Sequence, residues 1–117
     1  MGGEHSDTNI EIVNSLLETM SLENVRVLKG IFPDESKCFI DEKLIKFCHI
    51  DVDVFKSAKE IFEWVWNKLV VGGIVVYDDY GFSSCCGITK HVNELKDRND
   101  LICIHNLNGH AILIKIK

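Results

Sequence analysis

The chain has 117 residues, of which 46% are hydrophobic, and its formal net charge is -5. This length supports one hydrophobic core, so we expect a single domain over residues 1–117. The negative charge and the scattered Lys and Arg residues argue against a nucleic-acid partner, which needs a basic face. No apolar run approaches the roughly 20 residues that span a bilayer, and the amino terminus has no signal-peptide pattern. We therefore predict a cytoplasmic protein that binds neither nucleic acid nor membranes.

The five cysteines form no Cys-x-x-Cys pair. An odd count without such a pair indicates neither a disulfide framework nor a zinc knuckle. Cys48 and Cys103 lie in apolar runs and are interpreted as small buried side chains. The adjacent Cys85 and Cys86 have no neighbour in sequence that would stabilise a thiolate, so a reactive pair is the less favoured interpretation.

A helix and a short strand are predicted for the first third of the chain. Thr8-x-x-Glu11 is a capping box in front of apolar residues at helical spacing, which predicts a helix ending near Ser21. Residues 24–31 alternate apolar with polar and then reach Pro33, which predicts a strand that stops there. The polar stretch that follows, residues 33–43, is predicted as a loop.

The middle of the chain reads as strand, helix, strand. Residues 44–53 contain a nearly continuous apolar run, which is typical of a parallel strand covered on both faces. Asp53 is predicted to cap a helix with apolar residues every three or four positions, and Gly72-Gly73 is predicted to end it. Residues 74–77 then form a second buried strand that closes in Asp78-Asp79-Tyr80-Gly81.

The last third predicts a helix and a hairpin. Ser83 or Ser84 is placed to cap a helix that runs out near residue 96. Residues 101–107 and 110–117 are rich in β-formers, and Asn108-Gly109 between them suits a tight type I′ turn. Alternating strands and helices indicate an α/β domain, Rossmann-like, with a mainly parallel sheet and a C-terminal antiparallel hairpin.

Acidic residues follow both buried strands of the middle region. In open α/β sheets, ligands bind outside the carboxyl ends of the strands, and one crossover helix makes these two strands probable neighbours. Strands about 4.8 Å apart would bring Asp51, Asp78 and Asp79 together, where a hard divalent cation would neutralise them. The alternative is that these residues only cap helices and stabilise turns. From its spacing, His49 is more readily a core residue than a ligand.

The motifs Phe47-Cys48-His49-Ile50-Asp51-Val52-Asp53 and Gly72-Gly73-Ile74-Val75-Val76-Tyr77-Asp78-Asp79-Tyr80-Gly81 resemble the carboxyl-terminal half of the macrocin O-methyltransferase family. Residues 25–34 also resemble the segment that precedes these motifs. The family consists of class I enzymes that use S-adenosylmethionine to methylate sugar hydroxyls in natural products. The resemblance implies a truncated class I methyltransferase fold and a small-molecule acceptor.

The resemblance also implies roles for particular residues. Asp51, Asp78 and Asp79 would hold Mg²⁺, which binds acceptor oxygens and lowers the pKa of the hydroxyl that attacks the methyl group. Asp51 or His49 would be catalytic, and Asp53 is a weaker candidate for taking the proton. Pro33 and Asp34 would lie on the adenine side of the cofactor. Where the family writes Leu-Tyr, this chain has Val54-Phe55 and lacks the hydroxyl.

The glycine-rich loop with which class I methyltransferases bind their cofactor has no counterpart in the sequence. Without the strand that precedes such a loop, the strand at 24–31 must pair directly with 44–51, pair elsewhere, or leave an open edge. Proteins usually cover an open edge by pairing with another chain. We therefore expect a homodimer, or a fragment of a longer chain. Two other functions remain: a non-catalytic metal-binding or assembly module, and, less favoured, a phosphoacceptor receiver domain, whose acidic pair would come early rather than last.

Overall fold

The computed structural model describes residues 8–41 and 43–117. The chain divides into two compact units, Met1–Phe39 and Ile40–Lys117, and each is described by itself. In the described residues, no helix combines the length and the apolarity needed to cross a membrane.

Over residues 8–39, the first unit contains one α-helix, α1 (Ile10–Thr19), followed by irregular chain and a short 3₁₀ helix, η1 (Lys37–Phe39). The helix is capped by Asn9, whose side-chain oxygen accepts the N–H of Ile12 at 2.8 Å, and not by Thr8 as predicted. The predicted strand at residues 24–31 is also wrong, because these residues form no strand. A strand exists only when its backbone groups bond to another strand, and alternation alone cannot supply that partner.

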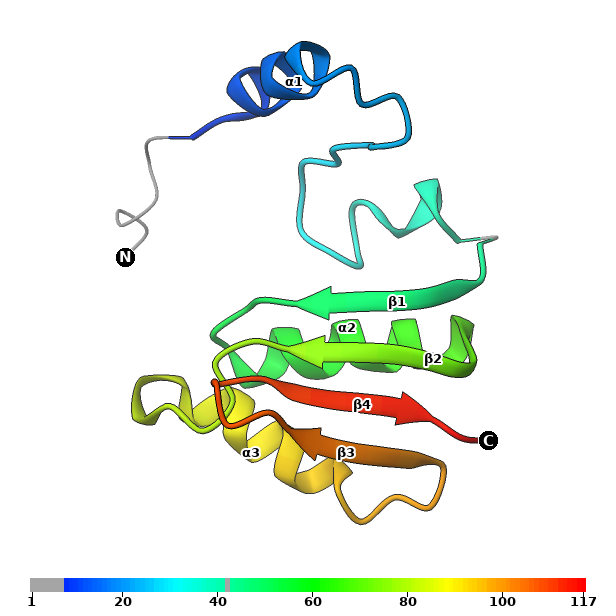
Figure 1. Ribbon diagram of the computed structural model, residues 1–117, viewed down its shortest axis with the longest axis vertical. Helices are drawn as coiled ribbons and strands as arrows, with labels where there is room; N and C mark the ends of the chain where they lie inside the picture. Colours follow the sequence, from blue (N-terminus) through cyan, green and yellow to red (C-terminus); the bar gives the residue numbers. More distant parts are fainter. Residues whose placement is uncertain (1–7, 42) are drawn as a thin grey trace. The chain divides into compact units, whose positions relative to one another are not determined.

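The second unit is built on a four-stranded sheet in the order β1-β2-β4-β3 (Figure 1). Its strands are β1 (Ile45–Ile50), β2 (Leu69–Tyr77), β3 (Leu101–His105) and β4 (Ala111–Lys115). β1 and β2 are parallel, whereas β4 is antiparallel to both β2 and β3. The α/β fold with a C-terminal hairpin is therefore confirmed, although the sheet is mixed, with one parallel pairing.

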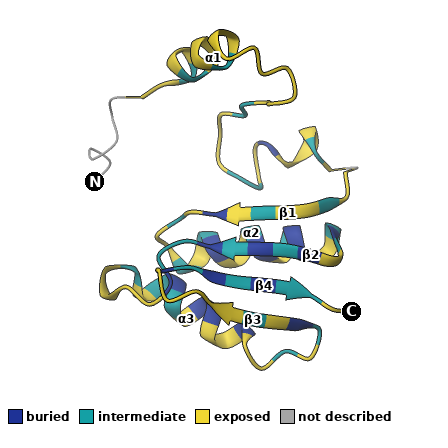
Figure 2. Cartoon of the chain, in the orientation of Figure 1, coloured by how far each residue is buried: buried dark blue, intermediate teal, exposed yellow. Residues whose placement is uncertain are grey.

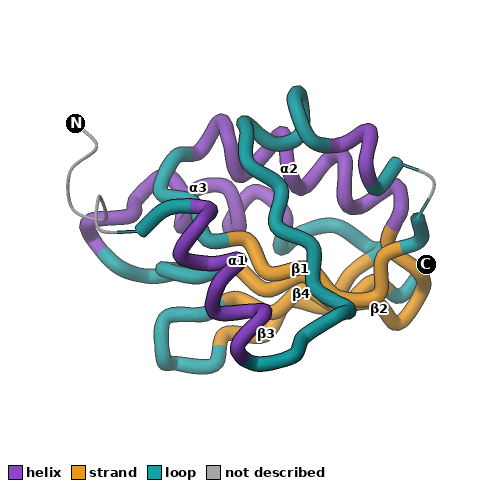
Figure 3. Tube along the Cα trace, turned by 90° about the horizontal axis from the view of Figure 1, so that it is seen from above, coloured by secondary structure: helices purple, strands orange, loops and turns teal. Residues whose placement is uncertain are grey.

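Two helices, α2 (Phe55–Lys68) and α3 (Cys86–Leu95), lie against the same face of the sheet (Figures 1 and 3). Their inward sides and the facing strand residues form the core, as the burial colours show (Figure 2). The largest fully buried side chains are Tyr77, Phe62, Ile88, Leu113, Val65, Val75 and Val92. The continuous apolar runs of the sequence thus correctly predicted β1 and β2 as strands, but the expected cover on both faces is wrong for β1, where Phe47 is 62% exposed.

The junction between α2 and β2 differs from the prediction. Gly72-Gly73 does not end the helix, because α2 stops at Lys68 and Leu69 begins β2, where its side chain is buried. The amino group of Lys115 donates to the backbone oxygens of Trp66 and Leu69 at 2.8 and 2.9 Å, which satisfies carbonyls at the helix end. Gly72 has a φ of 81°, where the pairing register with β1 is irregular.

The hairpin between β3 and β4 is present, but its turn is not the predicted two-residue type. Five residues, 106–110, separate the strands. The side-chain oxygen of Asn106 accepts the N–H groups of Asn108 and His110 at 2.9 and 3.1 Å. This side-chain bonding adds to the backbone hydrogen bond in which the N–H of Asn106 donates to the carbonyl of His110 at 3.2 Å, and it favours a wider loop.

A buried histidine links α3 to the sheet and predicts how stability depends on pH. His91 is 2% exposed, and its Nε2 lies 2.9 Å from the hydroxyl of Tyr77. Burial lowers the pKa of His91, with Lys59 acting in the same direction and Glu94 and Glu63 against it. The unfolded chain therefore binds a proton that the folded chain resists. The contribution of His91 to the free energy of unfolding should be greatest above about pH 6.5, and it should decrease as the pH drops below this value.

The variant His91→Gln keeps a hydrogen-bonding group but does not titrate. We expect its melting temperature to fall less than that of the unmodified chain between about pH 7.5 and pH 5.5. His105→Gln, at an exposed position, is the control and should behave like the unmodified chain. An equal fall in all three proteins would show that His91 does not govern acid sensitivity.

Candidate functional site at the strand ends

The carboxyl ends of β1 and β2 lie at one edge of the sheet, and the β3–β4 loop reaches the same edge (Figure 1). Asp51 follows β1, and Asp78 and Asp79 follow β2. The N–H of Asp78 donates to the carbonyl of Ile50 at 3.0 Å, so the pairing of the two strands continues to the acidic residues. The predicted adjacency of these two strand ends is therefore confirmed.

Asp78 lies between two imidazole rings. Its Oδ1 is 3.2 Å from Nε2 of His110, and its Oδ2 is 3.9 Å from Nε2 of His49. The side chain of His49 is 45% exposed, so the interpretation of this residue as a core histidine is wrong. His110 comes from the far side of the hairpin loop and was missed by sequence reasoning. Only the pairing of β4 with β2 brings it to this edge, and no local pattern reports that pairing.

Asp79 belongs to a second group of side chains. Its backbone is left-handed, with a φ of 59°. Ligand atoms of Asp79, Asp53 and Cys85 all lie within 4.8 Å of one another, and the thiol of Cys85 is 3.8 Å from Oδ1 of Asp53. Asp53 does not cap α2, since the N-cap is Val54 without a side-chain bond. In the structure, Asp79 therefore forms a group with Asp53 and Cys85. Asp51 is not part of this group.

Like charges surround Asp79. Partial burial raises the pKa of its carboxyl group, and the nearby carboxylates of Asp78, Asp51 and Asp53 raise it further, whereas His110 acts in the opposite direction. A carboxylate that is harder to ionise because of its neighbours would gain from a cation held among them. The electrostatics of the strand ends therefore favour a bound positive charge.

Pro33 and Asp34, the residues predicted for the cofactor, lie in the first unit. They are part of a turn in which the N–H of Lys37 donates to the carbonyl of Pro33 at 3.0 Å. The side chain of Asp34 is exposed. In residues 8–39 the structure describes no strand that could precede a glycine-rich loop.

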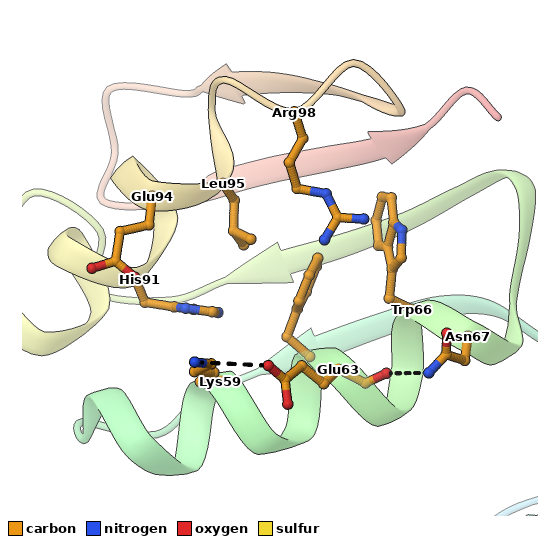
Figure 4. Close-up of a pocket in the computed structure, with 9 residues that line it drawn as sticks. Lys59, Glu63, Trp66, Asn67, His91, Glu94, Leu95 and Arg98 are labelled. Carbon is orange, nitrogen blue, oxygen red and sulfur yellow. Dashed lines mark hydrogen bonds and ion pairs between the residues drawn. The ribbon is translucent and has the colours of Figure 1, made fainter.

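A separate cleft of about 530 Å³ lies between α2 and α3 (Figure 4). The guanidinium of Arg98 lies over the ring of Trp66, 5.0 Å from its centroid, and Lys59, Glu63 and Asn67 line the α2 side of the cleft (Figure 4). The cleft shares no residue with the strand-end groups, and two of its charged side chains, Lys59 and Glu63, form an ion pair at 3.9 Å. It is therefore distinct from the candidate site.

The second unit's sheet, its helices and its acidic strand ends define a class I methyltransferase fold, as the similar solved structures show. The O-methyltransferase NovP is 21% identical with a TM-score of 0.78, and the match covers 94% of this chain and 46% of NovP. A putative caffeoyl-CoA O-methyltransferase from Staphylococcus aureus is 23% identical with a TM-score of 0.75, covering 91% of this chain and 59% of that protein. CalS11, a TDP-rhamnose 3'-O-methyltransferase of calicheamicin biosynthesis, is 14% identical with a TM-score of 0.72, covering 89% and 50%.

The chain belongs to the macrocin-O-methyltransferase (TylF) family, which matches residues 9–109. This confirms the resemblance found in the sequence and extends it through α1. The chain spans about half the length of the first two solved relatives, 46% and 59%. A search of curated proteins finds no match.

Proposed function

We propose that this chain is part of an S-adenosylmethionine-dependent O-methyltransferase that acts on a small hydroxylated acceptor, such as a sugar or another natural product. The observation that carries the proposal is the family match over residues 9–109, which includes the acidic residues at both strand ends. The relatives NovP and CalS11, which are O-methyltransferases by their descriptions, support the same reaction.

We further propose that Asp51, Asp78 and Asp79 hold Mg²⁺. Carboxylate oxygens are the donors that Mg²⁺ prefers, and the raised pKa of Asp79 indicates uncompensated negative charge at this edge. Asp79 also lies with Asp53 and Cys85, and the charges of Asp78 and Asp51 both act on its carboxyl group. When bound, the ion would supply Lewis-acid activation of an acceptor hydroxyl.

The remaining residues of the edge would orient the acceptor and move its proton. His49 is exposed beside Asp78 and can accept a proton from a hydroxyl that approaches the strand ends. Asp51, on the loop directly after β1, is the carboxylate alternative. His110, which contacts Asp78 at 3.2 Å, would hold that carboxylate in place.

The described residues do not form a complete pocket for S-adenosylmethionine. None of the strands is followed by a Gly-x-Gly turn, and only Pro33 and Asp34 correspond to cofactor contacts implied by the family. Family membership nevertheless implies use of this cofactor. Isothermal titration of the chain with S-adenosylmethionine in the presence of Mg²⁺ tests the proposal, and the absence of binding heat would contradict it for this chain.

A second candidate is an assembly module that keeps the fold without catalysis. It is favoured by the sheet order, in which β1 forms an edge, and by Leu44 and Phe47, which are 79% and 62% exposed beside it. An exposed apolar edge strand is a template for pairing with another chain. We propose pairing of two copies along β1.

If two copies pair along β1, Phe47→Lys should convert a dimer into a monomer in sedimentation equilibrium, because it places a charge on the paired edge. Lys56→Ala, at an exposed position on α2, is the control and should remain dimeric. If the unmodified chain sediments as a monomer, the proposed pairing along β1 is wrong.

A further inference from the structure

A second groove, of about 600 Å³, borders the loop that carries the acidic residues. It lies between that loop and one side of α3. The residues that matter for its chemistry are Phe82, Ser83, Thr89, Lys90, Asn93 and Glu94. None of the roles proposed above uses these side chains, so their arrangement needs a separate explanation.

The groove presents one aromatic ring that is held in place. Phe82 is 51% exposed, yet it packs against the backbone of Gly109, where an added Cβ would come within 2.3 Å of the ring. The carbonyl of Gly109 accepts the N–H of Tyr80 at 2.7 Å, which fixes the hairpin loop against this segment. A ring that is ordered before binding loses little entropy when a ligand stacks on it.

The polar groups around this ring both donate and accept hydrogen bonds. Thr89 accepts the N–H of Gly81 at 3.0 Å and keeps its own hydroxyl hydrogen to donate. Asn93 accepts the hydroxyl of Tyr80 at 2.9 Å through its oxygen, which leaves its NH₂ group available. Lys90 and Glu94 contribute one charge of each sign. A balanced set of this kind suits an uncharged ligand with many hydroxyl groups better than a phosphate.

The groove is continuous with the candidate site through one loop. The N–H of Phe82 lies 3.5 Å from the carbonyl of Asp79, and Cys85 of the strand-end group directly precedes Cys86 of the groove. Asp79 and Cys85 lie in the strand-end group, while Phe82 and Ser83 line the groove. A ligand in the groove would therefore extend from the place where the acceptor hydroxyl reacts.

We propose that this groove is an acceptor subsite that binds an uncharged polyhydroxylated ring by stacking on Phe82, with Ser83, Thr89, Lys90, Asn93 and Glu94 bonding to its hydroxyls. The assignment rests on the proposed function, because it places the part of the acceptor that is not methylated. It adds that residues of α3, outside the acidic strand ends, select the acceptor.

Titration of the ¹⁵N-labelled full chain with phenyl β-D-glucopyranoside, without S-adenosylmethionine, tests the subsite directly. We expect amide shifts at Gly81, Ser83 and Lys90 with a Kd on the order of 1 mM. Phe82→Ala should weaken binding about tenfold, because it removes the stacking surface. Phe82→Tyr, which keeps the ring, should bind like the unmodified chain. Phe39→Ala is the control, because Phe39 is an exposed phenylalanine of the first unit with no proposed role.

Other outcomes would overturn the assignment. Shifts confined to the α2–α3 cleft, or unchanged binding by Phe82→Ala, would remove the groove as the site. Glucose 1-phosphate binding at least about tenfold more tightly than the glycoside would make the groove an anion site. If Phe82→Ala fails to fold, Lys90→Met provides the same comparison. Because the cofactor is left out, glycoside binding without cofactor binding would retain the subsite and reject only the proposed reaction.

Discussion

Replacing Asp79 by Asn should weaken Mg²⁺ binding by at least about tenfold and raise the melting temperature of the metal-free chain. Both effects have the same cause. Partial burial raises the pKa of Asp79, and repulsion from the carboxylates of Asp78, Asp51 and Asp53 raises it further. A cation relieves this repulsion, and the neutral amide abolishes it. A residue that destabilises the free chain but is needed for the ion is typical of a binding site rather than of a turn.

Isothermal titration with MgCl₂ and thermal denaturation in chelator measure the two effects. Asp97→Asn is the matched control, because Asp97 is an exposed carboxylate at the end of α3 and should change neither quantity. A loss of Mg²⁺ affinity should also appear in Asp51→Asn and Asp78→Asn. Unchanged Mg²⁺ affinity in all three variants would show that these residues only cap helices and stabilise turns.

Phe62→Ala should destabilise the second unit by about 3–5 kcal/mol, the range for removing a large buried aromatic side chain. Phe62 is 1% exposed and stacks on Trp66 with ring centroids 5.0 Å apart. It also contacts His91 edge-on at 5.7 Å, and it lines the cleft between α2 and α3. The side chain therefore joins both helices to the sheet, and the space left by its removal would open toward this cleft.

Urea denaturation followed by tryptophan fluorescence measures this loss, since Trp66 reports on the same contacts. Glu63→Ala, at the next position on α2, is the control and should change the free energy of unfolding by less than about 0.5 kcal/mol. A loss below about 1 kcal/mol in Phe62→Ala would show that the helices are not held through this residue.

The sequence predicted the second unit well because its signals are local and strong. The apolar runs before Asp51 and Asp78 marked two strands, and the helix between them made parallel neighbours the natural arrangement. Burial on both faces was wrong for β1, which is an edge strand with Phe47 62% exposed. The position of the acidic residues at one sheet edge followed from these two facts. Asn108-Gly109 correctly marked the hairpin, although not the length of its loop.

The helix caps and the length of the hairpin loop were missed in local side-chain bonding, whereas the larger errors depended on contacts distant in sequence. Residues 24–31 alternate like a strand but have no strand partner in the described residues. Leu69 joined β2 because the core accepts its side chain there, and the Lys115 amino group, 46 residues away, bonds to its carbonyl oxygen. His110 reached Asp78 only through strand pairing. The grouping of Asp79 with Asp53 and Cys85 depends on side-chain directions, which no sequence pattern reports.

The most direct test of the central claim is calorimetric titration of the full chain with S-adenosylmethionine, with and without Mg²⁺. The account predicts saturable binding, with a Kd on the order of 0.1 mM because the glycine-rich loop is lacking. In the same titration, a chain that binds Mg²⁺ but gives no heat with the cofactor would contradict the assignment as a methyltransferase and favour the assembly module.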